Sequence, residues 1–143
     1  MIPKLIIQTW KDNNVPEKYR ELLKKIRENN KEFNYMFYTD ENIKTFMENH
    51  YPEYVGLFNQ FQYPIQRIDF FRYLVIYKYG GFYFDLDMDI DRSLDTLLEN
   101  EVVFPKEWQK NGDPILQEQN MPFLLGNYAF GACAGNLFLK KII

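Results

Sequence analysis

Residues 64–91 read PIQRIDFFRYLVIYKYGGFYFDLDMDID, and this segment gives the clearest indication of the architecture. Residues 64–79 are nearly all apolar, which predicts a helix that is buried over most of its circumference. The pair Gly80-Gly81 ends this helix. From Phe82 to Asp91, apolar residues alternate strictly with Tyr83 and a series of aspartates, and this period of two predicts a strand.

The sequence on either side alternates between short apolar runs and amphipathic segments. We expect further strands at residues 4–8, 35–38, 102–104 and 127–131, and further helices at 17–29, 41–50, 94–99 and 137–143. Residues 106–124 are expected to be irregular. Strands separated by helices predict an α/β fold with a mostly parallel sheet, helices on both of its faces and ligands at the carboxyl ends of the strands. Because the last predicted helix is still apolar and uncapped at Ile143, we expect a longer protein that continues beyond it.

The composition of the 143 residues narrows the class of protein. A chain of this length builds its core as one domain without disulfide or zinc staples. A single cysteine and a single histidine exclude a structural zinc site and fit a reducing compartment. The formal net charge of -3 argues against a nucleic-acid partner, which needs a basic face. No apolar run approaches the roughly 20 residues of a transmembrane segment.

The aspartates at 85, 87, 89 and 91 are the strongest chemical signal. On one face of an extended strand, carboxylates two residues apart lie about 6.6 Å apart, so neighbours repel by roughly 2.5 kcal/mol at an effective dielectric constant of about 20. A divalent cation offsets this repulsion most directly. Mg²⁺ and Mn²⁺ prefer oxygen ligands and are commonly held by one or two carboxylates together with substrate phosphates.

The aspartates have two other interpretations. They could be plain surface charges at a solvated strand end or loop. A calcium loop starting at Asp85 does not fit, because Ile90 stands where the sharp turn needs glycine and Thr96 stands where the bidentate glutamate belongs.

A second signal lies within the apolar helix, where Asp69 and Arg72 are one turn apart on the same face. A structural ion pair is the simpler interpretation. Burying such a pair often costs more free energy in desolvation than the pairing returns, so a functional role would explain its presence. The guanidinium of arginine can donate two hydrogen bonds to phosphate or sugar oxygens. Since Gly80-Gly81 leads from the helix directly into the aspartates, we expect Asp69, Arg72, Asp85 and Asp87 to converge.

These residues carry a resemblance to a known family. The runs RIDFFRYL (67–74) and YGGFYFDLD (79–87) resemble the Asp-x-Asp (DXD) sugar-binding region of a glycosyltransferase family. That family includes fungal Golgi α-mannosyltransferases, bacterial polysaccharide transferases and, more remotely, glucosylating toxins. Residues 2–11, IPKLIIQTWK, are similar to its amino-terminal strand. The resemblance implies the nucleotide-sugar transferase (GT-A) fold with a single Rossmann-like sheet, and one catalytic domain over residues 1–143 that holds the donor-binding portion.

The resemblance also implies roles for individual residues. Asp85 would contact ribose or sugar hydroxyls, and Asp87 would ligate the Mn²⁺ or Mg²⁺ that bridges the donor diphosphate. Asp69 and Arg72 would hold the transferred sugar, with Arg72 also near the phosphates. Trp10 would lie against the nucleotide base. Asp69, Arg72 and Asp85 are therefore the predicted catalytic residues, Asp87 is the predicted metal ligand, and Trp10 belongs to the predicted donor site.

The expected function is that of a metal-dependent glycosyltransferase that retains the anomeric configuration. It would move a sugar from a nucleoside-diphosphate donor to a hydroxyl of a glycan or lipid-linked saccharide. We expect a cytoplasmic protein that is peripheral to the membrane through this acceptor. Two alternatives remain open: a truncated module that binds nucleotide sugar without transferring it, and a metal-dependent phosphodiesterase or nuclease, since acidic clusters also serve phosphate chemistry.

Overall fold

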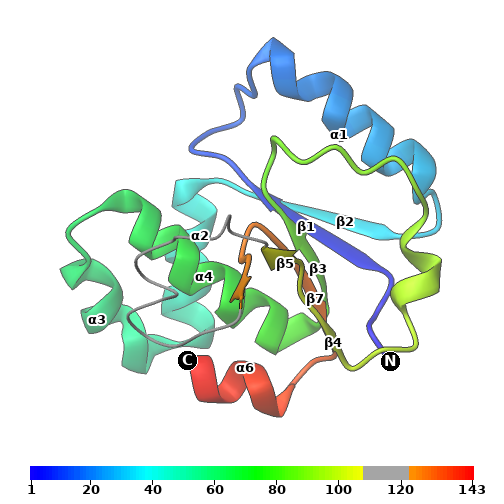
Figure 1. The fold of residues 1–143 in the computed structure, drawn as a ribbon. Coiled ribbons are helices and arrows are strands. Elements are labelled where there is room, and N and C mark those ends of the chain that lie inside the picture. Colours follow the sequence, from blue (N-terminus) through cyan, green and yellow to red (C-terminus); the bar gives the residue numbers. More distant parts are fainter. Residues whose placement is uncertain (108–122) are drawn as a thin grey trace.

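A mixed, mostly parallel sheet forms the centre of the computed structural model, which describes residues 1–107 and 123–143 (Figure 1). The strand order is β2-β1-β3-β7-β4. Strands β2, β1 and β3 are parallel, and β7 runs antiparallel to both of its neighbours, so that β4 points the same way as β3. The bounds are β1 Leu5–Thr9, β2 Asn34–Tyr38, β3 Gly81–Phe84, β4 Val102–Val103 and β7 Ala129–Ala132.

Helices cover both faces of this sheet, as the alternation of elements predicted. The first face carries α1 (Glu17–Asn29) and the 3-10 turn η2 (Leu94–Leu97), which pack on Ile6, Phe82 and Phe84. The opposite face carries the larger core, built on the strand residues Ile7, Tyr83 and Phe130. Its helical elements are α2 (Asp40–His50), η1 (Pro52–Tyr54), α3 (Val55–Gln60), α4 (Pro64–Tyr79) and α6 (Leu137–Ile142).

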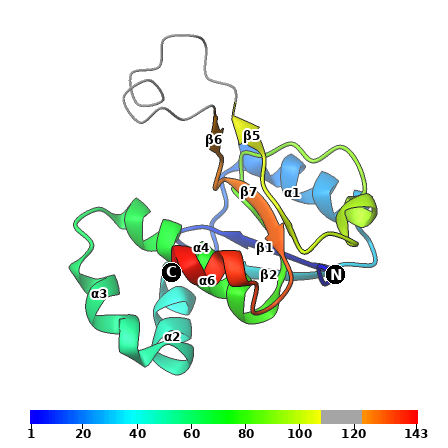
Figure 2. The same cartoon turned by 60° about the horizontal axis from the view of Figure 1, so that its bottom comes forward.

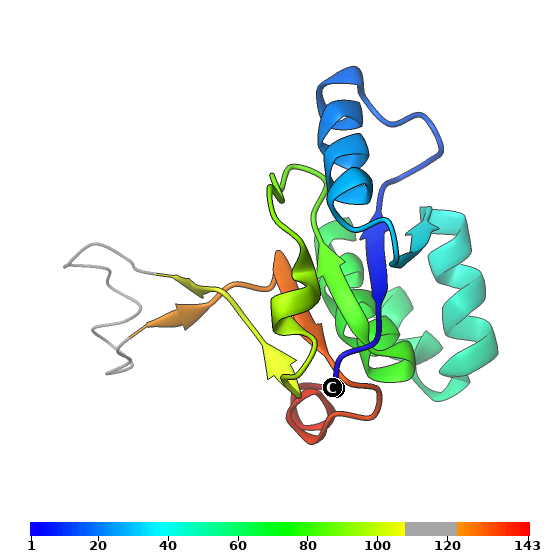
Figure 3. The same cartoon turned by 90° about the vertical axis from the view of Figure 1, so that its right-hand side faces the viewer.

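A short two-stranded ribbon, β5 (Lys106–Glu107) with β6 (Leu124–Leu125), projects from the sheet (Figures 2 and 3). It interrupts the segment 106–124 that the sequence predicted to be irregular, and the middle of that segment lies outside the described residues. In the part of the chain that is described, no helix is both long enough and apolar enough to cross a bilayer.

Helix α4 runs directly into β3 through two glycines with positive φ, 70° at Gly80 and 99° at Gly81. A Cβ atom on Gly81 would lie 2.6 Å from the carbonyl oxygen of Leu5. Only glycine therefore permits both this backbone conformation and the close approach of β1. The tight connection brings one end of α4 beside the first residue of β3.

The carboxyl-terminal half of α4 is buried, as predicted, but its first turn is not. Phe71, Leu74, Val75 and Ile76 are each fully covered by the larger core. Ile65 is 59% exposed, which is more than the apolar sequence led us to expect. Its apolar side chain instead borders the pocket described below.

The predicted strand from Phe82 to Asp91 is wrong beyond Phe84. Pairing with β1 and β7 ends there, and the amide of Asp85 donates to the carbonyl of Tyr128 at 2.8 Å as the chain leaves the sheet. The amide of Met88 then bonds back to the carbonyl of Asp85 at 3.2 Å, which forms a turn. The four aspartates consequently do not share one strand face, and the spacing of 6.6 Å assumed for them does not apply along the loop.

The loop after β3 has the sequence pattern of a strand because every second side chain is apolar and faces the core. Leu86 is buried, and Met88 and Ile90 are half-buried, with the latter two packed on the core beneath α1. Helix α1 also holds the loop by two polar contacts: Lys25 pairs with Asp89 at 2.5 Å, and the Asn29 amide donates to the carbonyl of Ile90 at 3.1 Å. The alternation of apolar and acidic residues therefore predicted correctly which side chains are buried. It predicted wrongly that the backbone pairs with a neighbouring strand.

Candidate active site

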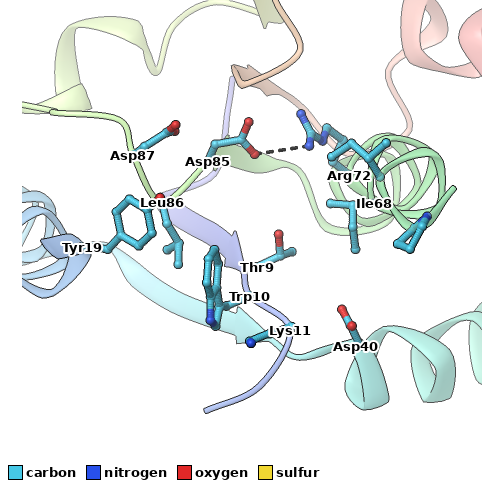
Figure 4. A pocket seen from close by; sticks show the side chains of 12 residues that line it. Thr9, Trp10, Lys11, Tyr19, Asp40, Ile68, Arg72, Asp85, Leu86 and Asp87 are labelled. Carbon is cyan, nitrogen blue, oxygen red and sulfur yellow. Dashed lines mark ion pairs between the residues drawn. The ribbon is translucent and has the colours of Figure 1, made fainter. Parts of the chain in front are cut away.

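A pocket of about 360 Å³ opens at the carboxyl ends of β1 and β3, between α1, α2 and α4 (Figure 4). Its position matches the rule that ligands of such sheets bind outside the carboxyl ends of the strands. The lining residues are Thr9, Trp10, Lys11, Tyr19, Asp40, Pro64, Ile65, Ile68, Arg72, Asp85, Leu86 and Asp87.

Arg72 lies at the centre of the acidic residues and is 2% exposed. Its Nη2 is 3.3 Å from Oδ1 of Asp69 and 3.3 Å from Oδ1 of Asp85, and its Nη1 donates to the carbonyl oxygen of Asn127 at 2.8 Å. The guanidinium also lies 4.7 Å from the ring centre of Tyr83. An isolated buried charge costs on the order of several kcal/mol, so these partners explain how α4 keeps an arginine in its core. The predicted convergence of Asp69, Arg72 and Asp85 is confirmed.

Asp85 is held by one of its two carboxylate oxygens. Oδ1 accepts a hydrogen bond from the buried hydroxyl of Tyr83 at 3.0 Å, in addition to its contact with Arg72. The Tyr83 hydroxyl also pairs with Oγ1 of Thr9 at 2.9 Å, and the Gln8 amide donates to the backbone carbonyl of Asp85 at 3.4 Å. No hydrogen bond to Oδ2 occurs among the described residues, which leaves this oxygen for a ligand.

Burial raises the pKa of Asp85 above the ordinary value of an aspartate. The carboxylates of Asp87 and Asp69 add to this effect, while Arg72 and the Tyr83 hydroxyl stabilise the ionised form and offset part of it. Burial also raises the pKa of Tyr83, which keeps its hydroxyl a hydrogen-bond donor to Asp85.

Asp87 follows two residues later and is exposed. It lines the same pocket, and its carboxylate is directed toward the side of Asp85 (Figure 4). No ion pair or hydrogen bond to this carboxylate is present in residues 1–107 and 123–143. Within those ranges, no three His, Cys, Asp or Glu side chains are grouped closely enough to hold a metal ion by themselves. A cation at Asp87 would therefore take further ligands from a bound phosphate or from water, as Mg²⁺ commonly does.

The opposite end of the pocket is aromatic. Trp10 directly follows β1, and its amide donates to the carbonyl of Tyr38 at 3.0 Å, which ties it to the end of β2. Its ring packs edge-on against Tyr19 of α1, with 5.5 Å between ring centres. Lys11 and Asp40 lie beyond it (Figure 4). The pocket therefore offers oxygen ligands at one end and a flat apolar surface at the other.

Sequence reasoning missed two residues that organise the site. The Asn127 amide donates to Oδ1 of Asp69 at 3.1 Å, from just before β7. Nothing near Asn127 in the sequence signals this role, because its partners lie more than fifty residues away. Tyr83 did carry a signal, since it shares the parity of Asp85 on the strand and a buried hydroxyl requires a hydrogen-bond partner.

The chain belongs to the glycosyltransferase family defined by a sugar-binding region containing the DXD motif, whose sequence model matches residues 16–104. It is 33% identical to inositol phosphoceramide mannosyltransferase 3 of Schizosaccharomyces pombe over 99% of this chain. It is 39% identical to mannosyl phosphorylinositol ceramide synthase CSH1 of Saccharomyces cerevisiae over 100% of this chain. These relatives confirm the resemblance to fungal mannosyltransferases.

A solved structure supports the fold independently. The PaToxG glycosyltransferase superposes on 98% of this chain and 58% of its own length with a TM-score of 0.67 at 19% identity. This confirms the predicted glycosyltransferase fold. The chain covers 36% and 35% of the two fungal relatives, so it spans about a third of their length.

Proposed function

We propose that this chain is the donor-binding part of a metal-dependent glycosyltransferase, which moves a sugar from a nucleoside-diphosphate donor to a hydroxyl of a glycan or lipid-linked saccharide. The observation that carries the proposal is one pocket lined by Arg72, Asp85 and Asp87, with Trp10 at the other end. Arg72 is paired with Asp85 and also with Asp69, which does not itself line the pocket. Mannose is the first sugar to test, because the two fungal relatives are named for mannosyl transfer.

The acidic end suits the donor diphosphate. The exposed carboxylate of Asp87 would hold Mn²⁺ or Mg²⁺, as the resemblance implies. Beyond the ribose or sugar contact expected of Asp85, its Oδ2 would also reach this cation, because only Oδ1 is bonded to other side chains of the described structure. A divalent cation here neutralises the negative charge that develops on the departing diphosphate. The two carboxylates also orient the donor, because a ligand held at two fixed points has little freedom to rotate.

Asp69 and Arg72 would define the subsite of the transferred sugar. Asp69 is 40% exposed at its side chain, so its carboxylate can accept hydrogen bonds from sugar hydroxyls while Arg72 and Asn127 hold it in place. Arg72 itself is nearly buried and directs its donors at the two carboxylates and a carbonyl. We assign it chiefly to positioning these carboxylates. Retention of the anomeric configuration stays a prediction.

Trp10 would support the nucleobase. A flat indole at the pocket wall gains dispersion energy and excludes water when a base lies against it. The distance along the pocket from the aspartates to Trp10 is then spanned by the ribose and the diphosphate. The predicted cytoplasmic location and attachment to a membrane through the acceptor also stay predictions.

The deciding experiment compares Asp87→Asn with Asp91→Asn. Both substitutions remove one negative charge from the same loop, but Asp91 does not line the pocket. We expect Asp87→Asn to lower Mn²⁺-dependent affinity for a nucleoside-diphosphate sugar at least about tenfold, since a metal ligand is lost, and Asp91→Asn to leave it unchanged. Isothermal titration with and without Mn²⁺ measures both. Unchanged affinity in Asp87→Asn would contradict the proposal.

Two further assays separate the alternative functions. Incubation of the chain with donor and manganese, followed by chromatography of released nucleotide, distinguishes turnover from binding alone. Binding without any product would favour the truncated binding module. Cleavage of an oligonucleotide that depends on added metal would favour the phosphodiesterase, although the formal net charge of -3 provides little attraction for such a substrate.

A further inference from the structure

The side chain of Gln8 is an amide buried in the central part of the sheet. It is 2% exposed, and it follows three apolar residues of β1. An apolar side chain of similar size could occupy this position at little cost in stability, because a hydrogen bond within a protein largely replaces one with water. The amide therefore indicates that its hydrogen bonds do more than stabilise the core.

This amide joins β2 to the loop that follows β3, on the two sides of β1 in the sheet (Figure 1). Its Nε2 donates to the backbone carbonyl of Asp85 at 3.4 Å, and its Oε1 accepts from the hydroxyl of Tyr35 at 3.0 Å. The direction of both bonds is fixed, because a carbonyl oxygen can only accept. The Nε2 of Gln8 must face Asp85, which leaves its Oε1 for a hydroxyl that donates.

Tyr35 is suited to hold the amide in this orientation. The guanidinium of Arg27, from α1, lies 3.8 Å from the centre of the Tyr35 ring, and such a cation–π contact restrains the ring. Burial raises the pKa of Tyr35 more than Arg27 lowers it, so the hydroxyl keeps the proton that it donates. The Gln8 amide is therefore oriented from the side of β2 and α1.

The carbonyl that Gln8 binds is the first of the turn that carries Asp87. The amide of Met88 also donates to the carbonyl of Asp85, at 3.2 Å, so residues 85–88 form a turn with Asp87 at its third position. In residues 1–107 and 123–143, no other side chain bonds to the Asp87 carboxylate. The backbone of the turn therefore sets where this carboxylate lies, and Gln8 ties the start of that turn to the sheet.

Asp85 is held at its backbone and at its side chain by separate groups. Its carboxylate bonds to Tyr83 and Arg72, whereas its carbonyl bonds to Gln8. Tyr83 belongs to the core beneath α4, and Tyr35 packs against the core beneath α1. Loss of the Gln8 amide would consequently release the turn and leave the contacts of the Asp85 carboxylate in place.

We propose, on the basis of the proposed function, that Gln8 is a positioning residue for the metal-binding turn and that Tyr35 orients its amide. Gln8 itself would contact neither the cation nor the donor. By anchoring the carbonyl of Asp85, it holds the turn in one conformation before a cation arrives. Asp87 then binds the cation with little further loss of backbone freedom, and binding is tighter because this ordering is already complete.

Asn30 provides a matched control for a purely structural role. Its side chain is also buried, donates to the carbonyl of Ile26 at 2.8 Å and accepts from the amide of Leu94 at 2.8 Å. None of these three residues lines the donor pocket. Gln8→Met and Asn30→Leu therefore each replace a buried amide, bonded on both sides, by an apolar side chain of similar size, and only the first is connected to the metal-binding turn.

The first measurement is amide hydrogen exchange in the metal-free chain. We expect Gln8→Met to speed up exchange of the Met88 amide about fivefold, because the carbonyl that it bonds to is no longer anchored, and Asn30→Leu to leave it unchanged. Urea unfolding of each variant gives its global stability. Faster exchange at Met88 beyond the change in global stability indicates a local effect on the turn.

The second measurement is isothermal titration of Mn²⁺ into the chain with uridine diphosphate or guanosine diphosphate present, whichever binds the wild-type chain. Gln8→Met should lower Mn²⁺ affinity about tenfold, because groups that orient a metal ligand contribute that much to metal affinity. Tyr35→Phe should lower it about threefold, since the amide of Gln8 remains but is no longer oriented. Asn30→Leu should leave it unchanged.

The outcomes separate this inference from the function on which it rests. Unchanged Mn²⁺ affinity in Gln8→Met, or an equal loss in Asn30→Leu, would overturn the positioning role and leave metal binding intact. If the wild-type chain binds Mn²⁺ with neither nucleotide, the proposed function itself fails, and exchange at Met88 still decides whether Gln8 anchors the turn. Should Gln8→Met not fold, Tyr35→Phe decides, because it leaves β1 unaltered.

Discussion

The side-chain amide of Asn127 donates a hydrogen bond to Oδ1 of Asp69 at 3.1 Å, although 58 residues separate the two. The backbone carbonyl of Asn127 accepts from Nη1 of Arg72 at 2.8 Å. The segment before β7 thus holds both polar residues of α4 from outside the helix. If Asp69 and Arg72 form the proposed sugar subsite, Asn127 is a positioning residue for it.

Replacing Asn127 tests this role. We expect Asn127→Ala to lower affinity for a nucleoside-diphosphate sugar about five- to tenfold, because the Asp69 carboxylate loses one of the bonds that orient it. Affinity for the nucleoside diphosphate without the sugar should change little, because its predicted contacts are at Asp85, Asp87 and Trp10. Titration of both ligands measures the difference, with Asn49→Ala, an exposed asparagine on α2, as control. Equal losses for both ligands would contradict a role in the sugar subsite.

The raised pKa of Asp85 predicts a pH dependence of metal binding. The ionised carboxylate binds the cation, so affinity should fall as the pH drops through the pKa of the folded protein, at a higher pH than for an ordinary aspartate. Because burial disfavours the ionised form, the contribution of Asp85 to stability is present at low pH and is lost as the pH rises through this pKa. Mn²⁺-dependent nucleotide binding measured from about pH 4 to pH 7 locates the midpoint.

The Tyr83 hydroxyl offers a control for this assignment. It stabilises the ionised form of Asp85, so Tyr83→Phe should move the midpoint of binding to higher pH. Tyr79→Phe removes a hydroxyl that bonds to His50, outside the pocket, and should leave the midpoint in place. If Tyr83→Phe leaves the midpoint of binding unchanged, another group controls the pH dependence.

The turn between α4 and β3 predicts a large effect of a small substitution. Gly81→Ala should lower the free energy of unfolding by at least about 2 kcal/mol, because φ is 99° there and the new methyl group would lie 2.6 Å from a backbone oxygen. Gly56→Ala on α3 meets open space and should raise stability by up to about 1 kcal/mol. Urea unfolding compares the two. Tolerance of alanine at residue 81 would contradict the turn.

Much of the site could be predicted because its parts are close in the sequence. Asp69 and Arg72 share a helix face through the period of 3.6 residues, and Gly80-Gly81 returns the chain to Asp85 within a few residues. Local periodicity therefore sufficed to bring these side chains together. Asp40 lines the pocket and Asn127 holds Asp69. Neither could be found in this way, because hydrogen bonds between distant segments place them there.

The alternation of strands and helices, the glycine turn and the family could be predicted because each depends on residues that are neighbours in the chain. The tertiary structure alone decided where β3 ends, since the aspartates alternate with apolar residues whether or not a partner strand is present to pair with them. It also decided which oxygen of Asp85 stays free. That choice depends on Tyr83 and Arg72 approaching the carboxylate together, and only the packing of α4 against the sheet produces that arrangement.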